Sequence, residues 1–199
     1  MTSGLRERKK LATRTALHRA ALQLVAERGL DDVSIDDIAA RAEVSPRTFF
    51  NYYGAKDDAV LGLDPDASRQ LAEAFAARPA DESPVESMRV VQRETAQAMA
   101  QDADLWSLRM TVIGAHPVLA GKLTAAFAET ERLLAAAIAA RTGDRVGVDV
   151  HPTLLAATQG VVIRTALHRW LTSGFTASLP ALVDEAWEAL ASGLRRPSG

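Results

Sequence analysis

Apolar residues recur every three or four positions along almost the whole chain, a spacing typical of amphipathic helices. In the first such segment the apolar positions are Leu17, Ala20, Ala21, Leu24 and Val25. Gly29 follows this run and predicts the end of the helix, because glycine readily takes the left-handed conformation that closes many helices. Similar runs continue toward the C-terminus, and no segment shows a convincing strand pattern. The sequence therefore predicts an all-α fold of about nine helices.

Two short helical patterns follow each other closely after this first helix. Ser34 can cap the first of them, with Asp37 at the third position as a capping box. Ser45 can cap the second, with Pro46 at its first helical position. Only two residues separate Ala42, where the first pattern ends, from the cap at Ser45. Helices joined so tightly cannot lie antiparallel and must cross steeply, which is the helix-turn-helix geometry.

The second of these short helices would present an unusual face to solvent. Phe49 and Tyr53 are expected to point into the core. Arg47, Phe50 and Asn51 then share the outward face. An arginine can bind guanine as a fork, an asparagine can pair with adenine, and an apolar group can press on a thymine methyl. This face therefore fits the major groove of DNA, with the alternative that all the rings are core and Arg47 is a solvated charge.

Other groups around the two helices fit phosphate oxygens rather than bases. Thr48, Tyr52 and Lys56 carry donors of this kind, and the backbone N–H groups beside Ser34 lie at a helix start, where anions bind. Residues 1–28 hold seven basic and two acidic side chains, whereas the whole chain has a net charge of −2. This basic end can steer one face toward DNA, or it is simply a solvated tail. The predicted DNA-binding residues are Arg14, Ser34, Ser45, Pro46, Arg47, Thr48, Phe50, Asn51, Tyr52 and Lys56.

The stretch VSIDDIAARAEVSPRTFFNYYGAKDDAV resembles the helix-turn-helix of the TetR family of bacterial transcription regulators. The resemblance covers residues 11–60 and includes the AERG end of the first helix. It implies a DNA-binding domain over residues 1–62 and a helical-bundle domain for ligand binding and dimerisation over residues 63–199. Glu43 stands where the family usually has glycine, so this turn is expected to carry backbone strain. Phe50 stands where the family often has tyrosine, and it cannot offer that hydroxyl to a phosphate.

The later helices carry apolar faces between which a bundle could hold a ligand. Methionines on these faces would adapt to varied ligands; the alternative is that each apolar residue is ordinary core. The segment HPVLAGKL resembles members of the family with acyl-CoA-type or similar lipophilic effectors. The predicted ligand-binding residues are Met88, Gln92, Thr95, Met99, Trp106, Arg109, Met110, Ile113, Phe127 and Thr158.

Arg109 is the most informative member of this set, because it interrupts the apolar run LWSLRMTVIG. A charge in such a position needs a partner. The partner is either an acid on a neighbouring helix or a carboxylate or phosphate on an effector.

The last two predicted helices, over residues 152–173 and 179–194, have wide apolar faces. Two such helix pairs from two subunits could pack as a four-helix bundle, or the faces could be buried within one subunit. Because a single recognition helix gives little affinity, we expect a homodimer that reads two DNA half-sites.

Composition excludes several classes of function. The chain has no cysteine, so disulfides and cysteine-ligated metals are impossible. No apolar run is long enough to span a bilayer and no signal peptide is visible, so a cytoplasmic protein without a membrane partner is expected. The histidines lack metal-ligand spacing, and no nucleophile elbow or phosphate-binding glycine loop appears. We therefore expect no cofactor and no catalysis.

These features together predict a ligand-responsive transcriptional regulator. We expect a repressor that leaves its double-stranded operator DNA when a small lipophilic, acyl-CoA-like effector binds. The alternatives are an all-α enzyme whose catalytic groups escape recognition and a helical adaptor protein without DNA binding.

Overall fold

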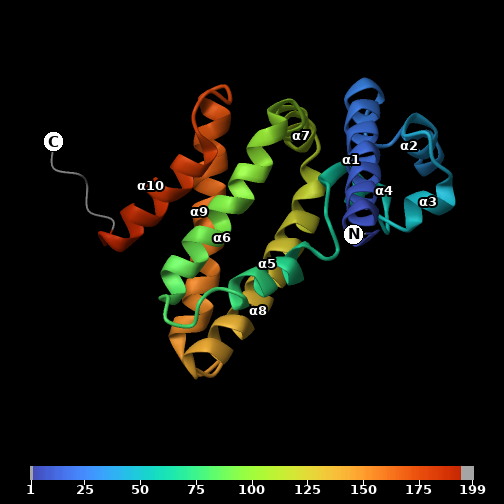
Figure 1. The fold of residues 1–199 in the computed structure, drawn as a ribbon. Helices are drawn as coiled ribbons and strands as arrows, with labels where there is room; N and C mark the ends of the chain where they lie inside the picture. Colours follow the sequence, from blue (N-terminus) through green and yellow to red (C-terminus); the bar gives the residue numbers. More distant parts are fainter. Residues whose placement is uncertain (1, 194–199) are drawn as a thin grey trace. The chain divides into compact units, whose positions relative to one another are not determined.

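The computed structural model describes residues 2–193, with side chains described from residue 8 onward. Within these residues every regular element is helical, which confirms the all-α prediction. The elements are α1 (Thr2–Arg28), α2 (Ile35–Arg41), α3 (Pro46–Phe50), α4 (Lys56–Leu61), α5 (Ala67–Ala76), α6 (Pro84–Met99), a 3-10 turn (Ala100–Asp102), α7 (Ala103–Ala115), a second 3-10 turn (Pro117–Leu119), α8 (Ala120–Thr142), α9 (Val150–Thr172) and α10 (Leu179–Ala191) (Figure 1).

The observed helices differ from the predicted ones mainly at their ends. The segment around Pro65 separates two helices, α4 and α5. The last helix ends at Ala191 rather than at residue 194, which lies outside the described residues. No helix in the described part of the chain combines the length and the apolarity that crossing a bilayer requires.

The contacts divide the chain into two compact units. The N-terminal unit comprises Met1–Ala67 and Asp104–Thr124, and the C-terminal unit comprises Ser68–Ala103 and Ala125–Gly199. Helices α1 to α4 therefore share their unit with most of α7 and the start of α8. The functional boundary at residue 62 stays a prediction, because contacts alone do not say what each part does.

The core of the N-terminal unit forms where α1 packs against α2 and α4. Leu17 and Leu24 of α1 are buried there together with Ile38 of α2. Phe49 of α3 is fully buried and Tyr53 is 2% exposed, which confirms their predicted inward orientation. Burying each of these rings contributes roughly 2–3 kcal/mol. The short helix α3 is thus held on one side by its own aromatic residues.

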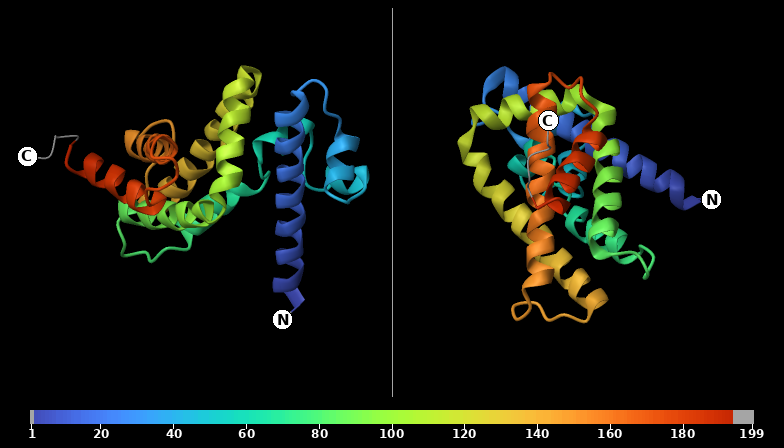
Figure 2. Two further views of the ribbon diagram at one scale, coloured as in Figure 1. Left: turned by 90° about the horizontal axis from the view of Figure 1, so that it is seen from above. Right: turned by 90° about the vertical axis from the view of Figure 1, so that its left-hand side faces the viewer.

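In the C-terminal unit, helices α6, α9 and α10 lie side by side (Figure 2). Met88 of α6 and Val183 of α10 are fully buried between them. Gln92 of α6 is also buried; its amide donates to the carbonyl oxygen of Gln159 at 2.9 Å and accepts from the indole N–H of Trp187 at 2.8 Å. This one side chain joins all three helices by hydrogen bonds.

Candidate DNA-binding interface

Helix α2 begins with the predicted capping box. The Ser34 hydroxyl accepts the backbone N–H of Asp37 at 3.1 Å, and the Asp37 carboxylate accepts the backbone N–H of Ser34 at 3.0 Å. Hydrogen bonds from Ser34 hold the pKa of Asp37 below its usual value. The reciprocal bonds satisfy two backbone donors that a helix start leaves open, so the position of α2 is fixed locally.

The turn between α2 and α3 closes through a Schellman motif. The N–H of Glu43 donates to the carbonyl oxygen of Ala40 at 3.1 Å, and the N–H of Val44 donates to that of Ala39 at 2.9 Å. This geometry places Glu43 at φ +55°, in the left-handed region that favours glycine. The strain expected at Glu43 is therefore present.

Helix α3 starts at the predicted cap. The Ser45 hydroxyl accepts the backbone N–H of Thr48 at 3.1 Å and lies 2.9 Å from the Thr48 hydroxyl. Pro46 follows as the first helical residue, where a missing N–H is tolerated. Both hydroxyls take part in hydrogen bonds of the cap. Ser45 and Thr48 therefore have only their remaining hydrogen-bonding capacity available for DNA.

The outward face of α3 is open to solvent. Pro46, Arg47 and Asn51 are exposed, and Phe50 is 57% exposed with its ring packed edge-on against Phe49 at 5.5 Å. Arg47 makes no hydrogen bond or ion pair with any side chain that the structure describes. The helix therefore holds a guanidinium, a carboxamide and an aromatic ring ready for a partner, because their neighbours Phe49 and Tyr53 anchor the opposite side.

The side chains predicted to contact phosphates are more engaged in contacts within the protein than those on the outward face of α3. Lys56 begins α4, and its ammonium donates to the carbonyl oxygen of Leu30 at 2.5 Å, which leaves two further donors. Tyr52 is half-buried and packs against the core of the unit. Ser34 is exposed, but its hydroxyl belongs to the capping box. Lys56 is thus the member of this group best able to reach a phosphate.

Arg14 does not lie on this face. Its guanidinium pairs with Asp64 and its side chain is 13% exposed, while its backbone carbonyl accepts the Tyr53 hydroxyl at 3.2 Å. The sequence analysis placed Arg14 among the DNA-binding residues as part of the basic N-terminal end, and its partner Asp64, 50 residues later, gave no local signal of this pairing. In the structure Arg14 instead holds Asp64 and the Tyr53 hydroxyl in place.

Two exposed arginines near the interface escaped the sequence analysis. Arg41 forms a double hydrogen bond with Glu27 at 3.0 and 3.2 Å, and Arg28 lies 3.7 Å from Asp37. Exposed ion pairs of this kind contribute little to stability, so phosphates could replace the acids.

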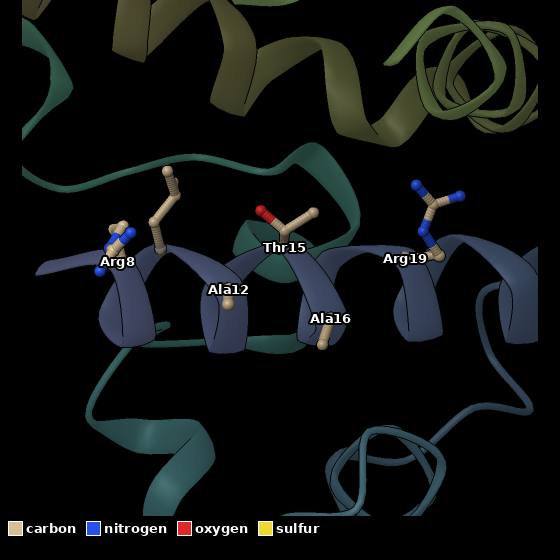
Figure 3. A pocket seen from close by; sticks show the side chains of 6 residues that line it. Arg8, Ala12, Thr15, Ala16 and Arg19 are labelled. Atoms are coloured by element: carbon tan, nitrogen blue, oxygen red, sulfur yellow. The ribbon is translucent and has the colours of Figure 1, made fainter. Parts of the chain in front are cut away.

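A shallow hollow along α1 also went unpredicted (Figure 3); it is lined by Arg8, Leu11, Ala12, Thr15, Ala16 and Arg19.

The predicted ligand-binding residues are divided between the two units. Trp106, Arg109, Met110 and Ile113 lie on α7 in the N-terminal unit, whereas Met88, Gln92, Thr95, Met99, Phe127 and Thr158 lie in the C-terminal unit. Met88 and Gln92 are buried in the core that α6, α9 and α10 form. The hydroxyls of Thr95 and Thr158 donate to carbonyl oxygens of their own helices. Met88 and Gln92 are therefore core residues, and the two threonine hydroxyls have acceptors within their own helices.

Among the described residues Arg109 has no acidic partner, which was the first of the two that the sequence suggested. Its guanidinium carbon lies 4.4 Å from the centre of the Trp106 ring. Its Nε is buried and finds no acceptor in the described part of the chain. Burial lowers the pKa of Arg109 to about 10, and the nearby Tyr53 hydroxyl opposes this shift only in part.

The crossed pair α2–α3, with its exposed polar face, defines a helix-turn-helix protein. Comparison with known proteins agrees. The model for bacterial regulatory proteins of the tetR family matches residues 17–61, and the model for the MftR C-terminal domain matches residues 82–195. The chain belongs to the TetR family and is a transcriptional regulator, not an enzyme.

Individual relatives extend along nearly the whole chain. The HTH-type transcriptional regulator TcmR of Streptomyces glaucescens is 30% identical over 96% of this chain and 87% of its own length. MftR of Mycobacterium tuberculosis is 28% identical over 95% of this chain and 94% of its own. Among solved structures, Thermus thermophilus FadR in complex with lauroyl-CoA is 25% identical, with a TM-score of 0.51 over 94% of this chain and 97% of that one. FadR of Bacillus halodurans shares the fold, with a TM-score of 0.58, 19% identity and coverage of 91% and 99%.

Proposed function

We propose that this regulator binds operator DNA through α3 and leaves it when a small lipophilic effector binds. One observation carries the first half: Arg47, Phe50 and Asn51 lie together on an exposed face whose reverse side is core. Arg47 would read guanine, Asn51 would read adenine, and Phe50 or Pro46 would contact a thymine methyl. A repressor is the role that this arrangement serves most simply, because a protein seated on an operator excludes others from it.

Phosphate contacts would fix the orientation of α3 without reading sequence. Lys56 supplies two free donors, and Thr48, Tyr52, Ser45 and the N–H groups beside Ser34 flank the same helices. Replacing Lys56 with alanine should therefore weaken binding to all sequences about equally and reduce the salt dependence.

We assign homodimerisation to α9 and α10. The apolar stripe of α10 is buried inside its own unit, with Leu179 and Val183 fully buried. Helix α9, by contrast, keeps Leu154 and Val161 61% and 48% exposed. These two positions are seven residues apart and share one helix face. A second copy of this face would cover them around a two-fold axis, with α9 contributing the apolar centre.

The effector is proposed to be acyl-CoA-like. A relative that is 25% identical over nearly the whole chain binds lauroyl-CoA. The unliganded dimer would hold its two α3 helices about 34–36 Å apart, one turn of B-DNA. An effector that fits best a conformation with another spacing must, by thermodynamic reciprocity, weaken DNA binding.

A mobility-shift titration on the promoter region beside the protein's own gene tests this function. We expect a duplex complex whose affinity falls steeply between about 50 and 200 mM salt. Adding lauroyl-CoA should release the DNA, whereas coenzyme A alone should not. The absence of duplex binding at every salt concentration would contradict the proposal and leave a helical adaptor as the alternative.

A further inference from the structure

A partly buried polar cluster lies behind α3 in the N-terminal unit. It consists of Tyr53, Arg14, Asp64 and Arg109, here called the Tyr53 cluster. The Tyr53 hydroxyl donates to the carbonyl oxygen of Arg14, whose guanidinium pairs with Asp64. Burial raises the pKa of the Tyr53 hydroxyl, and the nearby charges of Arg14 and Arg109 act against this rise. Residues from α1, from the segments that follow α3 and α4, and from α7 thus lie near one another.

The charges in this cluster do not balance. The cluster contains two guanidinium groups and one carboxylate, and that carboxylate already accepts from Arg14 and from the backbone N–H of Asp66. The Nε atoms of both Arg14 and Arg109 are buried without an acceptor among the described residues. Buried donors without partners are rare and destabilising, so the cluster lacks one anionic acceptor.

The surroundings of Arg109 offer an aromatic ring in place of an acid. The guanidinium lies over Trp106, a contact that compensates only part of the loss of hydration. Leu105 and Val112 of the same helix are buried in the core of the unit, and Ile113 packs against that core. A cation held beside a ring and aliphatic side chains, with a free N–H, suits an anion that is attached to an apolar body.

We infer that Arg109 anchors the anionic group of the effector, and this inference rests on the proposed function. A carboxylate or phosphate oxygen would accept the Nε–H and an adjacent N–H of Arg109, the forked arrangement that guanidinium groups form with such anions. The aliphatic part of the effector would lie against Trp106 and the apolar residues of α7. The same chemistry is available from a free fatty acid and from the phosphates of an acyl-CoA.

The position of this anchor explains how an effector could act on DNA binding. Tyr53 lies in the short segment between α3 and α4, and Arg14 belongs to α1, which packs against α2 and α4, so both residues support the recognition helix. An anion at Arg109 would draw Arg14 away from Asp64 and change the support of Tyr53. Effector binding and DNA binding then favour different arrangements of the Tyr53 cluster. Linkage between two binding sites requires a two-state element of this kind.

Calorimetric titration with laurate, 1-dodecanol and lauroyl-CoA tests the anchor. Wild-type protein should bind laurate or lauroyl-CoA at least about tenfold more tightly than 1-dodecanol, which has the same chain without the charge. Arg109→Gln should bind all three with affinities close to that of 1-dodecanol, and Arg109→Lys should be intermediate. Arg132→Gln, which removes an exposed arginine that pairs with Glu129 on the same helix, should behave as wild type. Which of the two anionic probes binds distinguishes fatty acid from acyl-CoA.

Stability supplies an independent readout. Because the unliganded cation lacks an anion, Arg109→Met should melt at or above the temperature of the wild-type protein. A strong loss of stability in Arg109→Met, or unchanged laurate and lauroyl-CoA affinity in Arg109→Gln and Arg109→Lys, would overturn the anchor.

DNA release, followed in the same samples, separates this inference from the proposed function. If the anionic probe dissociates the DNA complex equally from wild-type protein and Arg109→Gln, the regulator proposal stands and the anchor fails. If probe binding depends on Arg109 but the DNA complex persists, the anchor stands and effector-controlled release fails. If none of the three probes binds wild-type protein, both are wrong.

Discussion

The ammonium of Lys122, in the first turn of α8, lies 2.9 Å from the carboxylate of Asp58 and 3.6 Å from that of Asp57, both in the first turn of α4. The hydrogen bond to Asp58 raises the pKa of Lys122. Helix α8 begins in the N-terminal unit and continues beyond Ala125 into the C-terminal unit. The ion pair therefore joins α4, which follows the recognition helix α3 in the chain, to α8, whose residues belong to both units.

Lys122→Met should uncouple effector binding from DNA binding. The pair is partly exposed, so its loss should destabilise the protein by only about 0.2–1 kcal/mol. The factor by which lauroyl-CoA weakens DNA binding, expected at about 5–150-fold in the wild type, should fall several-fold. Fluorescence anisotropy of a labelled operator duplex with and without lauroyl-CoA measures this factor. Lys122→Arg, which keeps the charge, is the control; a full coupling factor in Lys122→Met would show that the ion pair transmits nothing.

Glu43→Gly should stabilise the protein. The left-handed backbone at Glu43 costs a residue with a Cβ roughly 1–2 kcal/mol, which glycine does not incur. Part of that gain is lost because glycine is freer in the unfolded chain, so the net increase in unfolding free energy should be about 1 kcal/mol. Urea denaturation gives this difference. Glu43→Gln removes the charge but keeps the Cβ and should gain nothing, and equal stability of the two variants would mean that the turn is not strained.

Gly62→Ala should destabilise the protein by about 1–3 kcal/mol. Gly62 ends α4 at φ +61°, and an added Cβ would stand 2.8 Å from the His18 ring. The His18 ring cannot easily move, since its Nδ1 lies 2.7 Å from the carbonyl oxygen of Ala59. Thermal unfolding measures the loss. Gly121→Ala, at a helical site with open space, should be neutral or stabilising, and a comparable loss there would remove the steric explanation.

Glu82 should make stability depend on acid pH. A salt bridge from Arg78 and a hydrogen bond from the Ser87 hydroxyl hold the pKa of Glu82 at about 2, below the ordinary value of 4.5. The unfolded state therefore binds the proton more readily. The stabilisation is fully present above about pH 4.5 and disappears as pH falls toward 2.

The unfolding free energies of wild type and Glu82→Gln should accordingly differ at neutral pH and converge at about pH 2–3. Urea titrations at several pH values measure the difference. Glu94→Gln, which changes an exposed carboxylate on α6, should show a smaller dependence. A difference between wild type and Glu82→Gln that stays constant with pH would contradict the assignment.

The sequence predicted the α2–α3 unit well because its signals are local. The caps at Ser34 and Ser45 and the strained turn at Glu43 all depend on residues within a few positions of each other. Pairings between distant residues could not be predicted. Arg14 pairs with Asp64 only because the segment after α4 lies against α1 in the folded chain. Gln92 accepts a hydrogen bond from Trp187, which is separated from it by 95 positions in the sequence. Helical periodicity also does not tell which neighbour covers an apolar face, so the apolar stripe of α10 could be expected at a subunit interface although its own unit buries that stripe.

Selection of duplexes from a random library, by wild-type protein and by Arg47→Ala, tests the central claim that the outward face of α3 reads base edges. Wild-type protein should enrich an inverted repeat, because a two-fold dimer presents two copies of α3. Arg47→Ala should bind the selected sequence about 1–3 kcal/mol more weakly and lose preference at one base position in each half-site. If wild-type protein enriches no sequence, or if Arg47→Ala selects the same bases with the same affinity, α3 does not read DNA in the way described.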